Sequence, residues 1–184
     1  MPGADWLVGG DRRAAAAERI YAAAASLIAR DGINNLDIDK LAKAVHCSRA
    51  TIYRHAGGKA DIRNVVLARA AARIADSVRA DVENLTGRER VVAAIRLSLR
   101  QIRADPLGQT IISAIRGGTR EVAWFAESPL LADFATDLAG LDGADPLAAK
   151  WVVRTVLSLM YWPTEDDEVE RRLVENFVAP AFAK

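Results

Sequence analysis

Hydrophobic residues recur every three to four positions along most of the chain, and no segment alternates apolar and polar residues over the length of a strand. Glycine and proline fall mostly between these periodic segments, where helices end. The pattern therefore predicts an all-α fold. We expect about nine helices, over residues 11–30, 38–45, 49–55, 59–83, 91–104, 107–116, 130–139, 146–162 and 165–179.

Side chains suited to capping mark several of the expected helix starts. Asp11, Asp37 and Thr164 precede the first, second and last predicted helices, and Gly32 supplies a stop for the first. The first ten residues contain two glycines and a proline without a periodic pattern. We therefore expect residues 1–10 to form a flexible arm.

Composition narrows the class of protein. The chain has 184 residues, 51% of them hydrophobic, and a formal net charge of +1, which excludes intrinsic disorder and allows a packed core. A single cysteine excludes an internal disulfide and favours a reducing compartment. No apolar run reaches the length of about 18 residues that spans a bilayer, and the N-terminus does not resemble a signal peptide. We therefore expect a soluble, cytoplasmic protein.

Charge is unevenly distributed along the chain. Residues 40–63 hold six basic residues against one acidic residue, whereas the rest of the chain is acidic on balance. A local basic cluster within a neutral chain is typical of phosphate contact. A solvated basic face would give the same distribution, so charge alone leaves both interpretations open.

The helices expected in this basic segment add a second signal. Two short helices joined by a tight turn at 46–48 can cross steeply, so that the second enters a DNA major groove while the first braces it. Leu41 and Val45 of the first helix would pack against Ile52 of the second, with the small Ala42 where the backbones approach. The second helix is unusually polar and basic for this chain.

Residues 36–62 read LDIDKLAKAVHCSRATIYRHAGGKADI. They contain the pair Leu41-Ala42, the pattern Ser-x-x-Thr-Ile-Tyr at 48–53, and Lys59, which opens the next helix. In these features the segment resembles the helix-turn-helix of the TetR family of transcriptional repressors. The resemblance implies a DNA-binding domain at residues 11–58 and a helical ligand-binding and dimerisation domain at residues 59–184.

The resemblance also implies roles for individual residues. Thr51, Tyr53 and Lys59 correspond to phosphate contacts, and the start of a helix favours an anion beside Lys59. Arg49 and Ala50 stand where base edges are read, so Arg49 would pair with guanine and Ala50 would touch a thymine methyl. The expected DNA-binding residues are Ser48, Arg49, Ala50, Thr51, Tyr53, Arg54, His55 and Lys59.

Two residues depart from the family pattern. His46 stands in the turn where the family usually has glycine; if this position needs a positive φ, histidine tolerates it better than most residues but at some cost. Asp39 lies in the first turn of the supporting helix, a region that often faces DNA. A carboxylate there would repel phosphate unless it accepts from cytosine N4 or pairs with Lys43.

The sequence gives little indication of a metal site, a phosphate-binding loop or an enzyme active site. His46, Cys47 and His55 lack a fourth ligand at suitable spacing, so we expect neither a metal nor another cofactor. The Gly57-Gly58-Lys59 sequence lacks the earlier glycine and the Ser/Thr of a phosphate loop. Because no nucleophile–base or paired-carboxylate pattern stands out, we predict that the protein is not an enzyme.

The C-terminal part carries most of the aromatic residues. Core packing explains any one of them, but the resemblance implies an enclosed apolar pocket, whose expected lining is Leu99, Ile102, Ile111, Ile115, Trp124, Phe125, Phe134 and Trp151. Apolar stripes on the last two helices predict a homodimer contact through Trp151, Thr155, Leu159, Trp162, Leu173 and Phe177.

Together these patterns predict a dimeric, TetR-like repressor. It would bind a palindromic double-stranded operator through the helix at Arg49–His55 and leave DNA when a small, apolar effector binds. The principal alternative is an all-α ligand-binding protein or enzyme whose basic short helices do not bind DNA. A helical adaptor that binds protein is a further alternative.

Overall fold

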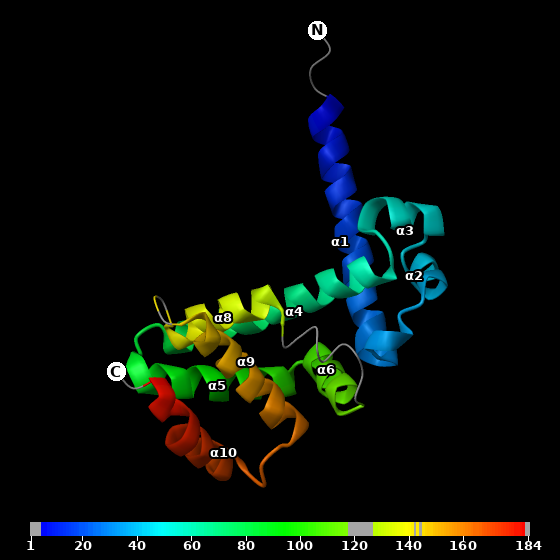
Figure 1. The fold of residues 1–184 in the computed structure, drawn as a ribbon. Helices are drawn as coiled ribbons and strands as arrows, with labels where there is room; N and C mark the ends of the chain where they lie inside the picture. Colours follow the sequence, from blue (N-terminus) through cyan, green and yellow to red (C-terminus); the bar gives the residue numbers. More distant parts are fainter. Residues whose placement is uncertain (1–4, 118–126, 142, 144, 183–184) are drawn as a thin grey trace. The chain divides into compact units, whose positions relative to one another are not determined.

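The computed structural model describes residues 5–117, 127–141, 143 and 145–182, with side chains described from Arg13 onward (Figure 1). These residues form nine α-helices and no strand, which confirms the all-α prediction. The chain divides into two compact units, an N-terminal unit, Met1–Arg69, and a C-terminal unit, Ala70–Lys184. The division falls within one helix, α4.

The N-terminal unit packs two short helices against one long helix. It contains α1 (Asp5–Asp31), α2 (Ile38–Ala44), α3 (Arg49–Ala56) and the first half of α4 (Lys59–Val82). In Figure 1, α2 and α3 lie beside α1, and each also contacts the other. Buried aliphatic residues from all of these helices form the core: Ile20, Ala24, Leu27, Ile28, Leu41, Ile52, Ile62 and Val66. The packing of α2 on α3 that the sequence predicts is therefore present.

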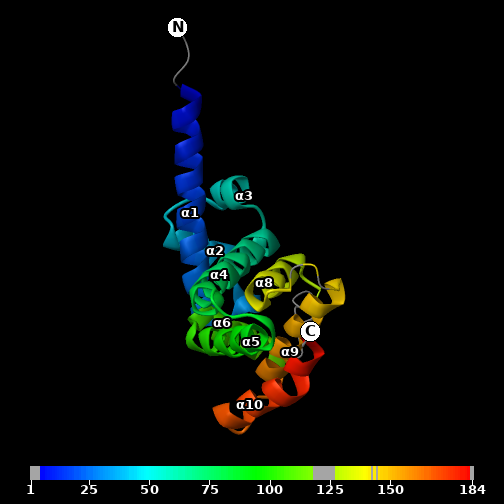
Figure 2. The ribbon, with the colours of Figure 1, turned by 90° about the vertical axis from the view of Figure 1, so that its left-hand side faces the viewer.

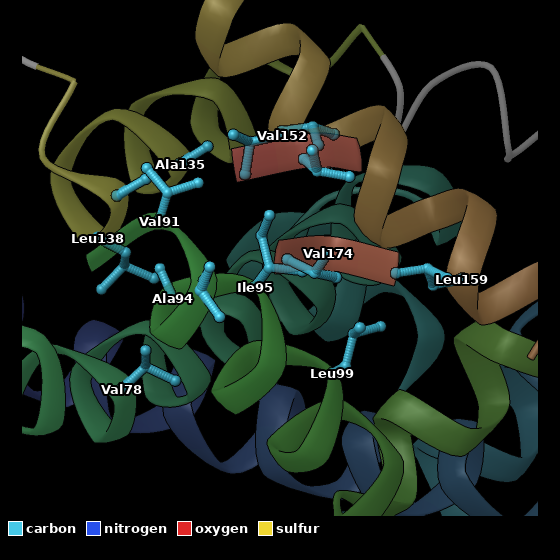
Figure 3. Close-up of a cluster of buried hydrophobic side chains, with 14 of the residues drawn as sticks. Val78, Val91, Ala94, Ile95, Leu99, Ala135, Leu138, Val152, Leu159 and Val174 are labelled. Atoms are coloured by element: carbon cyan, nitrogen blue, oxygen red, sulfur yellow. The ribbon is translucent and has the colours of Figure 1, made fainter. Parts of the chain in front are cut away.

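The C-terminal unit is built around α5 (Gly87–Ala104). Helices α6 (Pro106–Arg116), α8 (Pro129–Ala139) and α9 (Pro146–Tyr161) all contact it. Figure 2 shows α9 leading to α10 (Asp167–Leu173). Residues Val91, Ala94, Ile95 and Leu99 of α5 face side chains of α8, α9 and the C-terminal segment, which Figure 3 shows at Ala135, Leu138, Val152, Leu159 and Val174.

Several helix starts differ from the sequence predictions, and α5 begins at Gly87 rather than at Val91. The first helix begins at Asp5 rather than at Asp11, because residues 5–10 contain no proline to end the helix on its N-terminal side. Residues 5–10 are therefore helical rather than part of an irregular arm. The N-cap of the last helix is Asp166, not Thr164, because the Asp166 carboxylate accepts a hydrogen bond from Val169 N at 2.8 Å.

The last helix is also shorter than predicted. It leaves α geometry after Leu173 and continues as a π turn, Val174–Val178, and a 3-10 turn, Ala179–Phe182. Pro180 has no N–H to donate and restricts the residue before it, so a regular α-helix cannot continue through this segment. In the part of the chain that the structure describes, no helix is long and apolar enough to cross a membrane.

Asp105 links α5 to α6 and makes this junction sensitive to acid. Its carboxylate accepts hydrogen bonds from Leu107 N at 2.8 Å, Gly108 N at 3.1 Å and Arg73 Nη2 at 2.8 Å. Burial raises the pKa of the Asp105 carboxyl, but these hydrogen bonds outweigh it and hold the pKa below its ordinary value. The ionised carboxylate therefore stabilises the folded state.

We expect Asp105→Ala to lower the free energy of unfolding by about 1–2 kcal/mol at pH 7. Because the pKa is lower in the folded than in the unfolded state, this stabilisation is complete above the unfolded pKa of about 3.9 and is lost as the pH falls through the folded value. Urea unfolding at pH 7 and near pH 3 checks this. The difference in free energy of unfolding between wild type and variant should be smaller near pH 3 than at pH 7. An equal difference at both pH values would contradict the role of the ionised carboxylate.

Candidate nucleic-acid interface

Polar side chains at the starts of α2 and α3 fix both short helices. The Asp37 carboxylate accepts hydrogen bonds from Asp39 N at 2.7 Å and Lys40 N at 3.1 Å, and these two N–H groups hold the pKa of Asp37 below its usual range. Ser48 Oγ accepts from Thr51 N at 3.2 Å and lies 3.0 Å from Thr51 Oγ1. Ser48 therefore caps α3, and Thr51 supplies the backbone N–H that the cap satisfies.

The turn between the two helices requires a left-handed residue. His46 has a φ of +54°, as expected if the family's glycine position is retained. Its N–H donates to Lys43 O at 3.3 Å, and Cys47 N donates to Ala42 O at 3.0 Å, the paired hydrogen bonds of a Schellman helix end. Histidine is thus held in a backbone region that favours glycine.

We expect His46→Gly to raise the free energy of unfolding by up to about 1 kcal/mol, because glycine removes the Cβ contact that opposes this φ. The gain is limited by the greater backbone entropy of glycine in the unfolded chain. Thermal unfolding checks the effect, with His46→Ala as the control that keeps the Cβ. A His46→Gly variant less stable than His46→Ala would contradict it.

The two sides of α3 differ sharply in exposure. Ile52 is fully buried and Ala56 nearly so, which anchors the helix in the core. The opposite side is open, and Tyr53 is 54% exposed, so it is not a core aromatic. The remaining expected contacts divide into two groups: Ser48, Arg49, Ala50 and Arg54 are exposed, whereas Thr51 and His55 are half-buried.

Lys59 is exposed at the first position of α4. The same helix start already holds a carboxylate, since Gly58 N donates to Asp61 Oδ2 at 2.8 Å. An anion bound by Lys59 would therefore share this helix end with Asp61. The phosphate contact at Lys59 stays a prediction, and any anion there would lie beside the negative charge of Asp61.

Asp39 pairs with Arg49 rather than with Lys43. The two carboxylate oxygens accept from Nε and Nη2 of the guanidinium, so the pair is bidentate and joins α2 to α3. Both side chains are at least half exposed. The pair borders a depression of about 790 Å³ between the helices, whose lining also includes Lys43, His46 and Ser48.

Several contacts that hold α2, α3 and α4 against α1 were not predicted from the sequence. Arg13 of α1 donates to Arg54 O at 3.4 Å, and Lys40 Nζ lies 3.2 Å from Asp31 Oδ2. Glu18 of α1 receives two hydrogen bonds from Arg69 of α4, which lower the pKa of the glutamate. Each contact joins residues distant in sequence, so periodicity within one helix gives no signal for it.

The residues expected in the C-terminal part have more varied environments. Leu99 and Ile115 are buried in the core, while Ile102, Ile111 and Phe134 pack against it with partial exposure. Trp124 and Phe125 lie outside the described residues. Of the expected interface residues, Thr155 and Leu159 are buried within their own unit and Leu173 is half-buried, whereas Trp151, Trp162 and Phe177 are exposed.

Comparisons with known proteins agree with the geometry of the N-terminal unit. The family described as bacterial regulatory proteins, tetR family, matches residues 20–66. Uncharacterized HTH-type transcriptional regulators from two strains of Mycobacterium tuberculosis are 31% identical over 188 residues, covering 98% of this chain and 91% of each relative. The crystal structure of the TetR family repressor AlkX from a Dietzia strain, implicated in biodegradation of n-alkanes, matches with a TM-score of 0.56 and 18% identity. That match covers 89% of this chain and 93% of AlkX.

Proposed function

This chain belongs to the TetR family and is a DNA-binding transcriptional regulator, and we propose that it is a dimeric repressor that releases its operator when a small apolar molecule binds. Its DNA-binding head would comprise residues 11–58 and its regulatory body residues 59–184. Regulators of this family are not usually enzymes, and we assign the chain a binding role in the cytoplasm rather than a catalytic one.

The exposed face of α3 is the observation that carries the proposed DNA contact. Ile52 and Ala56 hold the helix in the core, so Arg49, Ala50, Tyr53 and Arg54 remain on its outer side. A helix presented in this way fits the major groove, with its N-terminal residues nearest the base edges. Arg49 and Ala50 occupy those N-terminal positions, and in this proposal the exposed Tyr53 and Lys59 contact phosphates.

A reporter experiment tests repression directly. A promoter that contains the bound sequence drives a fluorescent protein, with and without the regulator expressed in the same cells. Repression predicts lower fluorescence when the regulator is present, and the Arg49→Ala variant should restore it. Higher fluorescence with the regulator present would make the protein an activator and contradict the proposal.

Exposed aromatic residues support the proposed dimer. The outer face of α9 carries Leu147, 66% exposed, and Trp151, 51% exposed, and Trp162 just beyond its end is 70% exposed. Phe177 in the following segment is 79% exposed. Large apolar side chains in this number on one unit are typical of a subunit interface. We propose an isologous contact through these residues rather than through the buried Thr155 and Leu159.

We expect Trp162→Glu and Phe177→Glu to convert the dimer to a monomer at micromolar concentration, because each change places a charge in an apolar contact. Size-exclusion chromatography with light scattering measures the mass. Arg100→Glu, at an exposed position of α5, is the control and should remain dimeric. A monomeric wild-type protein, or variants that stay dimeric, would contradict this interface.

The effector would bind in the C-terminal unit. Ile102, Ile111 and Phe134 are partly buried beside the core and carry no charge, so an apolar or lightly polar molecule suits them better than a charged one. AlkX, which shares the fold, is implicated in biodegradation of n-alkanes. Medium-chain alkanes and alcohols are therefore the first compounds to test for a rise in the melting temperature and for release of bound DNA.

A further inference from the structure

The Asp39–Arg49 pair has a geometry that matters for base recognition. The carboxylate occupies one edge of the guanidinium, the edge formed by Nε and Nη2. This leaves the other edge, formed by Nη1 and the second hydrogen of Nη2, outside the pair. An arginine held in this way has a single pair of parallel donors to offer to a base, and guanine O6 and N7 are two acceptors at matching separation.

Folding stability does not account for this pair. Both partners are largely in solvent, with side chains 63% and 50% exposed, and ion pairs of this kind contribute little to stability. Arg49 is also the first residue of α3, where the helix dipole disfavours a cation, and the carboxylate offsets that effect. The pair therefore acts mainly on the direction and charge of Arg49.

We infer that Asp39 is a positioning residue that sets DNA sequence specificity by holding Arg49 in one orientation, with its outer edge presented to a guanine. The inference rests on the proposed role of Arg49 in reading bases. Asp39 itself contacts no base in this arrangement. Without Asp39, the Arg49 side chain would adopt several rotamers and could bind any nearby phosphate. A sequence-independent contact would then replace the specific contact to guanine.

The experiment uses a pool of double-stranded DNA with a randomised core of about 20 base pairs, long enough for two half-sites one helical turn apart, selected by the full-length protein and sequenced. The wild type should select a two-fold symmetric sequence with a guanine at one fixed place in each half. Asp39→Asn should lower the preference for that guanine by about tenfold or more. It should also raise affinity for the unselected pool and steepen the salt dependence of that affinity by about one unit of log–log slope per head.

Three further variants separate positioning from charge and from folding. Asp31→Asn removes an equal charge from the same unit but leaves the Arg49 pair intact, so the preference for guanine should not change. Asp39→Glu retains a carboxylate and should recover part of the preference. In an Arg49→Ala background, which itself lacks the preference, Asp39→Asn should have no additional effect on the selected sequence.

The outcomes distinguish the proposed function from the role of Asp39. A wild type that selects no sequence overturns the proposed function and this inference with it. A wild type that selects a sequence, with Asp39→Asn showing the same guanine preference and salt slope, overturns the inference alone. If Asp31→Asn and Asp39→Asn both lose the preference for guanine, the loss is due to the change in net charge, and the inference about Asp39 is also overturned.

Discussion

Gly108→Ala is expected to destabilise the C-terminal unit by about 2–4 kcal/mol, even though alanine is the better helix former by about 1 kcal/mol. A Cβ built at Gly108 would lie 2.0 Å from Ile102 O and 2.9 Å from Ile102 C. Both are backbone atoms of α5, so no side-chain rotation relieves the clash. Because α6 must move away from α5, the melting temperature should fall on the order of 10 °C.

Gly87→Ala provides the matched control. Gly87 has a φ of +50°, and a Cβ added there would meet no atom within 4 Å, so the substitution tests backbone strain without a clash. Its cost should be about 1–2 kcal/mol, below that of Gly108→Ala. Thermal unfolding of both variants measures the difference. A Gly108→Ala protein as stable as the wild type would contradict the close contact between α5 and α6.

Ile52→Ala and Tyr53→Ala should weaken DNA binding for different reasons, although the residues are adjacent. Ile52 is completely buried, so its truncation should lower the free energy of unfolding by about 2–5 kcal/mol. Because less of the DNA-binding unit would then be folded, binding to every DNA sequence should weaken. Tyr53 is 54% exposed, so its truncation should change stability by no more than about 0.5 kcal/mol. It should nevertheless weaken DNA binding about tenfold by removing the phosphate contact that we propose for Tyr53.

Circular dichroism during urea unfolding measures the folding stability of each variant. Fluorescence anisotropy with labelled DNA measures its affinity for DNA. Tyr53→Phe is a useful intermediate, because it keeps the ring and removes only the hydroxyl that would donate to phosphate. If Tyr53→Ala unfolds the N-terminal unit, or if Ile52→Ala leaves its stability unchanged, the assignment of Ile52 to the buried side and Tyr53 to the exposed side of α3 is wrong.

The sequence predicts the helices well wherever local chemistry decides them. Asp37 and Ser48 cap α2 and α3 as capping residues should, and Pro106, Pro129 and Pro146 begin helices within one residue of the expected starts. The buried positions of α1 follow its apolar stripe because that period is a property of a single helix. The positive φ of His46 could also be anticipated, since the turn itself requires it.

Contacts between helices are harder to anticipate. Spacing along one helix suggests Lys43 as the partner of Asp39, whereas the actual partner, Arg49, lies across the turn. The outward face of α9 depends on how the helix packs on α5 and α8, so an apolar stripe alone does not separate the exposed Trp151 from the buried Thr155 and Leu159. Nothing in the local sequence around Gly108 reveals that a neighbouring backbone lies against it.

The most direct test of the central claim is fluorescence anisotropy of the purified protein on duplexes tiled across the DNA upstream of its own coding sequence, together with a pool of genomic fragments. Specific regulation predicts tight binding confined to one palindromic sequence. Affinity for that sequence should fall about a thousandfold or more between about 50 and 200 mM salt. Weak binding of equal strength to every tile and every fragment would contradict it.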